Sequence, residues 1–209
     1  MNAARDHILS RIRAVGRPVE DVDASYAAIT RDYLPAHHDQ GVIDLFAERA
    51  ADYRAVVERV QAPDVPAAIA RVLAGRARVV IPGGVPPEWV AGLPDEVQPV
   101  ADEPLLSAAQ LDEMDGVLTG CAVAIAETGT IILDHGPAQG RRALTLVPDF
   151  HLVVVQAAQV APDLHGAFAR LDPGRPHTLI SGPSATSDIE LIRVEGVHGP
   201  RTLHILLSA

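Results

Sequence analysis

Short apolar runs alternate with helical patterns along residues 76–209, and this alternation constrains the fold more than any other feature of the chain. The apolar runs have the length and composition of buried strands: RARVVIP, HLVVVQ, HTLISG and RTLHILLS. Helical patterns lie between them, for example at 107–116, 161–171 and 187–196. Parallel strands need crossover connections, which are usually helices. The sequence therefore predicts an α/β fold with a mostly parallel sheet flanked by helices.

A helical N-terminal portion precedes this domain. DHILSRIRAVG places four apolar residues on one helical stripe and stops at Gly16. The pattern of residues 42–61 predicts one long amphipathic helix, and that of 64–76 predicts another that ends at Gly75. We predict a helical N-terminal extension over residues 1–40 and an α/β domain over 41–209.

Composition excludes several functional classes. The net charge is −10 and the isoelectric point is near 5.2, the opposite of a nucleic-acid-binding surface. Arginine accounts for all 17 basic residues, so lysine nucleophiles and P-loops are excluded. The single cysteine, Cys121, cannot form a disulfide within the chain, and an iron–sulfur cluster needs about four thiolates. The start lacks an apolar signal core, and no apolar run reaches the roughly 18 residues of a membrane span. We expect a cytoplasmic protein without a membrane span.

The segment TLISGPSATSDIELI, residues 178–192, combines a strand end with several hydroxyl side chains. Ser187 and Glu190 have the spacing of a helix capping box, which explains the acidic residues Asp188 and Glu190 structurally. Two carboxylates at a helix start disfavour phosphate. Three hydroxyls remain at the carboxyl end of the preceding strand, where α/β sheets place ligands: Ser181, Ser184 and Thr186. A site for a small oxygen-rich ligand and a stiff turn at Gly182-Pro183 both explain the pattern.

Three further groups are candidate site residues. Glu127 precedes Thr128-Gly129 in a predicted hairpin over 121–136, as either a solvated or a functional carboxylate. Arg141 or Arg142 is suited to hold a carboxylate by a two-pronged hydrogen bond, although an ordinary surface arginine is the default interpretation. His198, in a Gly-rich loop, is suited to act as an acid, a base or a donor. The histidines have no metal-binding spacing, so we predict no metal site.

The chain resembles the lactate utilization protein C family, within the LUD domain group. The motifs that carry the resemblance are GCAVAIAETGTIIL, GRR followed by VPDFHLVVV, TLISGPSATSDIELIRVEGVHGPRTLHILL and, more loosely, DLFAERAADYRAVVERV. They lie in order along most of the chain from about residue 42, most densely from 117 onward. The resemblance implies a fold like that of the NagB/RpiA/CoA-transferase group.

The resemblance also implies a function. Its family acts with two partner proteins to oxidise L-lactate to pyruvate, and the partners carry the iron–sulfur clusters. This chain would then be a subunit without a cofactor or redox centre of its own, with a small carboxylate as ligand. The family's signature falls on Glu127, Thr128, Gly129, Thr130, Arg141, Arg142, Ser181, Gly182, Pro183, Ser184, Thr186, Asp188, Glu190, His198 and Gly199.

Three hypotheses remain open at this point. The chain is a component of a lactate-oxidising system, in which Arg141 or Arg142 holds the carboxylate and His198 or Glu127 accepts the hydroxyl proton. Alternatively, it is an independent enzyme with acyl-transfer chemistry through Glu127, as in CoA transferases. A structural or regulatory subunit without an active site is the third hypothesis.

Overall fold

The computed structural model describes residues 3–16, 21–32, 40–186, 194–195 and 198–209, and the chain divides into two units. The first unit, Met1–Leu34, contains two helices, α1 (Ala3–Val15) and α2 (Val22–Ala27). The helix predicted before Gly16 is confirmed. The second unit, Pro35–Ala209, contains all other elements.

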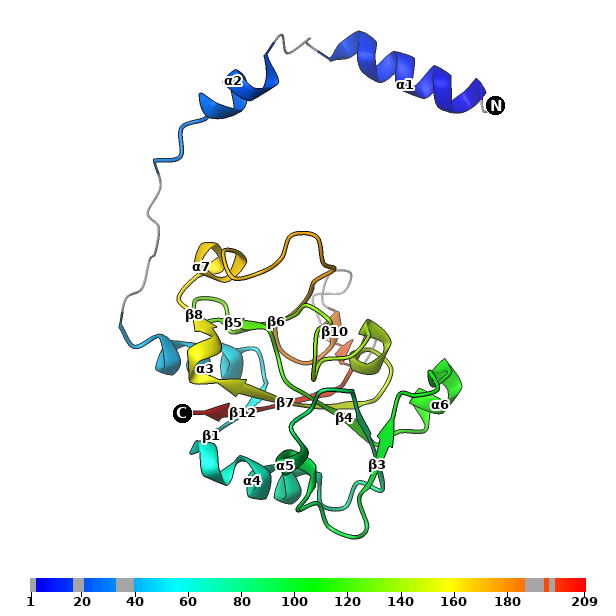
Figure 1. Cartoon of the computed structure of the whole chain (residues 1–209), viewed down its shortest axis with the longest axis vertical. Helices are drawn as coiled ribbons and strands as arrows, with labels where there is room; N and C mark the ends of the chain where they lie inside the picture. The colour runs from blue at the N-terminus through cyan, green and yellow to red at the C-terminus, as the bar shows by residue number, and fades with distance from the viewer. Residues whose placement is uncertain (1–2, 17–20, 33–39, 187–193, 196–197) are drawn as a thin grey trace. The chain divides into compact units, whose positions relative to one another are not determined.

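A six-stranded, all-parallel sheet lies at the centre of the second unit, so the predicted α/β fold is confirmed (Figure 1). The strand order is β1-β12-β7-β4-β2-β3, and every neighbouring pair is parallel. The strands are β1 (Val56–Val60), β2 (Arg78–Ile81), β3 (Gln98–Ala101), β4 (Gly116–Thr119), β7 (Phe150–Gln156) and β12 (Thr202–Ser208).

A second sheet of four strands packs over this one, and the sequence did not predict it. Its order is β8-β5-β6-β9, with β5 and β6 forming the predicted hairpin and β9 at the edge. The strands are β5 (Val123–Ile125), β6 (Thr130–Leu133), β8 (Val160–Ala161) and β9 (Thr178–Ile180). Strands β10 (Ala185–Thr186) and β11 (Val194–Glu195) pair with each other in a short antiparallel ladder that is not part of either sheet.

Helices lie on both faces of the parallel sheet and on the outer face of the second sheet (Figure 1). The α-helices are α3 (Val42–Asp52), α4 (Val65–Leu73), α5 (Pro87–Val90), α6 (Ala108–Asp112) and α7 (Leu164–Phe168). Single 3-10 turns are η1 (Ala62–Asp64), η2 (Arg142–Thr145) and η3 (Ala157–Gln159). The predicted cap at Ser107 is confirmed, because its hydroxyl and Gln110 form a capping box at the start of α6.

The alternation of side chains along β7 shows how the core is divided. Leu152 and Val154 pack in one cluster with α4, whereas Val153 and Val155 pack in another with α3 and the second sheet. Successive side chains of a strand point to opposite faces of the sheet, and both faces of a central parallel strand are buried. This explains why HLVVVQ is almost uniformly apolar. Odd-numbered residues of β7 therefore face the second sheet.

The long helix predicted over residues 42–61 is wrong in its second half. Helix α3 ends at Asp52, and Arg54 has a left-handed backbone with φ of 69°. β1 then begins at Val56 and runs parallel to β12. Helical periodicity continued by chance through residues whose β-branched side chains favour a strand.

Two expectations for residues 177–196 also change. The strand predicted at 177–182 exists as β9, but it lies antiparallel to β6 in the second sheet, not in the parallel sheet. The predicted helix at 187–196 is wrong at its end, because Val194 and Glu195 pair with β10. The capping box of Ser187 and Glu190 lies outside the described residues.

Candidate functional site

A cleft of about 290 Å³ opens where the loop after β9 meets the amino-terminal ends of β7 and β12. Clefts that hold small ligands typically begin at roughly this size. The polar side chains that line it include Arg142, His151, Thr178, Ser181, Ser184 and His198. Four of these were predicted from the sequence as site residues: Arg142, Ser181, Ser184 and His198. Pro183, Gly182 and Gly199, which carry part of the family signature, also line the cleft.

The two loops that form the wall are joined by hydrogen bonds. The Ser184 backbone N–H donates to the Pro200 carbonyl at 2.8 Å, and the Ser184 hydroxyl accepts from the His198 backbone N–H at 2.9 Å. Ser184 therefore fixes the loop that carries His198. The geometry gives this serine a structural role in addition to its position on the cleft.

Gly182 allows this wall to pack against the end of α3. Its φ is +79°, and a Cβ atom there would lie 2.4 Å from the backbone oxygen of Tyr53. Only glycine accommodates both the left-handed backbone and this close approach. The rigidity of the turn therefore comes from packing on Tyr53, not only from Pro183.

Three hydroxyls connect the hairpin turn to the cleft. Thr130 Oγ1 lies 2.7 Å from Thr128 Oγ1 and 2.8 Å from Ser181 Oγ. Thr130 is buried, so it holds Ser181 from inside the second sheet. Gly129 has φ of +60°, and a Cβ atom there would lie 2.4 Å from the backbone nitrogen of Ala50 in α3. The residues Thr128, Gly129 and Thr130 therefore do not line the cleft themselves but hold Ser181, which does.

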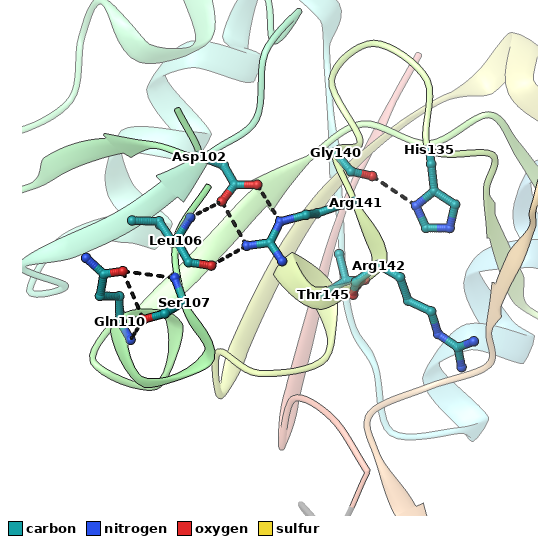
Figure 2. Close-up of polar contacts among 9 residues, drawn as sticks. All are labelled: Asp102, Leu106, Ser107, Gln110, His135, Gly140, Arg141, Arg142 and Thr145. Atoms are coloured by element: carbon teal, nitrogen blue, oxygen red, sulfur yellow. Dashed lines mark hydrogen bonds and ion pairs between the residues drawn. The ribbon is translucent and has the colours of Figure 1, made fainter. Parts of the chain in front are cut away.

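The two adjacent arginines have different surroundings (Figure 2). Arg141 donates from Nε to Asp102 Oδ2 at 2.7 Å and from a terminal nitrogen to Asp102 Oδ1 at 3.0 Å. The same nitrogen donates to the Leu106 carbonyl, so two of the three guanidinium nitrogens are engaged in structural hydrogen bonds. These hydrogen bonds hold the pKa of the Asp102 carboxyl below its usual range. Arg141 therefore connects η2 to the loop after β3.

Arg142 begins η2, and its side chain extends away from Asp102 (Figure 2). It is exposed and lines the cleft, and none of the described residues forms an ion pair with it. Of the two arginines that the sequence offered for a carboxylate, the structure leaves Arg142 available.

His151, like Thr178, is a polar cleft residue that the sequence analysis did not predict. It lies in β7, and its imidazole is only 1% exposed. Nε2 lies 2.7 Å from the hydroxyl of the equally buried Thr119 in β4. Burial lowers the pKa of His151 to about 4, so the ring is neutral at pH 7. A histidine at the start of an otherwise apolar strand was the available signal.

Glu127 does not join this cleft. It lines a separate, mostly apolar hollow with Asp163, Leu164, His165 and Phe168, beside α7. The pairing of Glu127 with His198 as alternative proton acceptors in one site is therefore not reproduced by the geometry. Glu127 remains a candidate only for chemistry of its own.

Three predicted residues cannot be placed on the site. Asp188 and Glu190 lie outside the described residues, and for Thr186 only the backbone, in β10, is described. Across the described ranges, no group of three or more potential metal ligands comes together. Within those same ranges, no helix is long and apolar enough to cross a membrane.

Comparison with known proteins assigns this fold to a known class. The family model of the LUD domain matches residues 97–208, more than half of the chain. The crystal structure of a DUF162 family protein from Deinococcus radiodurans superposes with a TM-score of 0.68 at 42% identity, covering 80% of this chain and 96% of that one. The fold is thus that of a LUD-domain protein.

Proteins of similar sequence identify the family within the LUD-domain class. Lactate utilization protein C of Deinococcus radiodurans is 50% identical over 170 residues, 79% of each chain. The Escherichia coli protein YkgG is 28% identical over 211 residues, 90% of each chain. The chain belongs to the lactate utilization protein C family, and the resemblance found in its motifs is confirmed.

Proposed function

We propose that this chain is a component of an iron–sulfur-dependent L-lactate oxidation system and has no redox centre of its own. Its cleft binds lactate or pyruvate, and two partner proteins carry the iron–sulfur clusters that accept the electrons. Family membership supports the lactate-related role, since relatives are named for lactate utilization. The partners and their clusters follow from the family resemblance.

The observation that carries the proposal is the charge of the cleft. The chain has a net charge of −10, yet the described residues that line the cleft include the cation Arg142 and no carboxylate. A carboxylate ligand entering elsewhere on such an acidic surface would meet repulsion. Arg142 offers a planar fork of donors that matches a carboxylate in two-pronged geometry. The lining therefore suits a small anion with a further oxygen.

The thiol inventory supports the division of labour. Cys121 is the only cysteine, it is buried, and burial raises the pKa of its thiol to about 12. A thiol that stays protonated is a poor metal ligand, because the thiolate is the ligand form. A cluster would also need about four such ligands. Electron acceptance is therefore assigned to the partners.

The residues of this chain contribute binding and proton handling. Oxidation of lactate to pyruvate removes two electrons and two protons, one of them from the C2 hydroxyl. His198 lies on the cleft wall and is the candidate to accept that proton, whereas Glu127 lies in a different hollow. Iron–sulfur clusters of the partners would take the electrons.

The test is reconstitution of L-lactate oxidation with the two partner proteins, with and without this chain, followed by reduction of a dye. We expect turnover only when all three are present, and a loss of at least about tenfold with Arg142→Met at subsaturating lactate. Turnover by the partners alone at the full rate would refute the proposal.

The same assay distinguishes the proposed role in lactate oxidation from the alternative, acyl transfer through Glu127. We expect Glu127→Gln to leave reconstituted lactate oxidation within about twofold of the wild-type rate, because Glu127 does not line the cleft. A CoA-transfer activity of the isolated chain that Glu127→Gln abolishes would favour the alternative instead.

A further inference from the structure

The position of His151 gives the floor of the cleft a polar group. His151 is the second residue of β7, and the alternation along that strand places it on the face of Val153, toward the second sheet. It is buried at 1% exposure and still lines the cleft. The other buried residues of this strand are apolar. A buried imidazole is unfavourable unless its nitrogen atoms form hydrogen bonds.

Thr119 fixes the imidazole. The two residues lie on neighbouring strands, with Val117 of β4 in register with His151, so Thr119 is the diagonal neighbour two residues on. The Thr119 hydroxyl engages Nε2 at 2.7 Å, and Thr119 is fully buried. Nδ1 is therefore the ring nitrogen that remains for a ligand. The ring cannot turn without losing this hydrogen bond.

A neutral imidazole next to a hydroxyl has two equivalent arrangements of its proton. In the complex of this chain with its ligand alone, when Nε2–H donates to Thr119, Nδ1 accepts the hydrogen bond of the alcohol, which has to turn to His198 for the proton transfer proposed above. When the Thr119 hydroxyl donates to Nε2, Nδ1–H donates to a carbonyl oxygen. The same pair thus contacts either oxidation state of a carbon–oxygen group without a change in charge. Burial keeps the ring in this neutral form at pH 7.

We propose that Thr119 and His151 form a recognition pair for the C2 oxygen of a 2-hydroxy or 2-oxo carboxylate whose carboxylate group Arg142 holds. This inference rests on the proposed function of the same cleft and deepens it. His151 contacts the ligand, and Thr119 is a positioning residue that acts through His151. Arg142 supplies affinity for any small carboxylate, whereas the pair supplies selectivity for the oxygen at C2.

The test is calorimetric titration of the full chain, without partners, with sodium L-lactate, pyruvate and propionate at pH 7.5. Propionate has the same carboxylate and carbon number but no C2 oxygen, so it reports Arg142 alone. We expect lactate and pyruvate to bind at least about tenfold more tightly than propionate, the equivalent of one hydrogen bond. Equal affinity for all three, or no binding of lactate, would overturn the inference.

Variants assign the selectivity to the pair. His151→Gln and Thr119→Val should each reduce the lactate-to-propionate preference to within about twofold of unity, with propionate affinity unchanged. Thr119→Ser keeps the hydroxyl and should restore the preference, which a purely structural role of Thr119 would not produce. Retention of the preference by a folded Thr119→Val protein would contradict the role of Thr119. The comparison of ligands on the wild-type chain tests the inference even if a variant does not fold.

The outcomes distinguish this inference from the proposed function. Selective lactate binding together with failed reconstitution would refute the role in lactate oxidation and leave the recognition pair standing. Reconstituted oxidation together with unselective binding would refute the pair and leave the role standing.

Discussion

Adjacent arginines with opposite surroundings provide the sharpest test of the site geometry. Arg141→Met and Arg142→Met remove the same charge from neighbouring positions and keep a side chain of similar length. The structure predicts that the first change lowers stability and that the second lowers ligand affinity. The pair is its own matched control, because both variants have the same net charge.

The magnitude for Arg141 follows from its contacts. It makes two charged hydrogen bonds to Asp102, whose side chain is only 11% exposed, and a third to the Leu106 carbonyl. Loss of hydrogen bonds to a charged group costs about 1.5–3 kcal/mol. For a chain of this size, at about 2–4 °C for each kcal/mol, we expect Tm to fall by roughly 3–12 °C.

Arg142 has no such contacts among the described residues and is exposed. Its replacement should change the free energy of unfolding by at most about 0.5 kcal/mol. Loss of a charged hydrogen bond to the ligand should weaken L-lactate binding by at least about tenfold. Urea unfolding followed by circular dichroism measures the first quantity, and calorimetric titration measures the second.

Either of two results would contradict these roles of Arg141 and Arg142. An Arg141→Met protein as stable as wild type would show that the Asp102 pair contributes nothing. An Arg142→Met protein with unchanged lactate affinity would show that the carboxylate binds elsewhere.

Three further predictions test the surroundings of the cleft. Gly182→Ala should destabilise the fold by roughly 1–3 kcal/mol more than Gly75→Ala, because both glycines have positive φ but only the Cβ at 182 would meet backbone atoms; equal losses in urea unfolding would argue against the close approach. Burial lowers the pKa of His151 from about 6.5, its usual value, to about 4, so the unfolded chain binds the proton first and stability falls as pH drops from about 6.5 to 4, by roughly 3 kcal/mol. His151→Gln should remove that part of the pH dependence, and an identical stability–pH profile for both proteins would contradict a buried neutral ring. Ser184→Ala should cost about 1 kcal/mol through loss of one hydrogen bond to a backbone N–H, and an unchanged Tm would show that the two loops are held by other contacts.

The sequence predicted the parallel sheet well because burial on both faces leaves a clear signal. Runs such as HLVVVQ and RTLHILLS are long, apolar and β-branched, and they form adjacent central strands β7 and β12. The hairpin around Thr128-Gly129 was also recognisable from its turn residues. The local sequence pattern was sufficient to predict a strand wherever its apolar residues are the ones that the fold buries.

The rest depended on contacts between distant segments. Residues 53–60 continue a helical pattern, and only the left-handed backbone at Arg54 and the pairing with β12 make them a strand. The assignment of β9 to a second sheet likewise depends on its partner β6, 45 or more residues away in sequence. No local pattern encodes which sheet a short strand joins.

Part of the candidate site could likewise be predicted from the sequence, and part depended on contacts between distant segments. Residue types identified Arg142, Ser181 and Ser184, but spacing could not distinguish Arg142 from its neighbour, since the deciding partner, Asp102, is 39 residues away. His151 was concealed within an apolar run, where its role depends on Thr119 across the sheet. Only the tertiary structure shows that Arg141 is held by Asp102, whereas Arg142 lines the cleft.

A crystal structure of the full chain soaked with L-lactate tests the central claim most directly. We predict one lactate in the cleft, with its carboxylate at the Arg142 guanidinium and its hydroxyl oxygen within hydrogen-bond distance of His151 Nδ1. Lactate bound beside Glu127 instead, or an empty cleft at saturating lactate, would contradict the account.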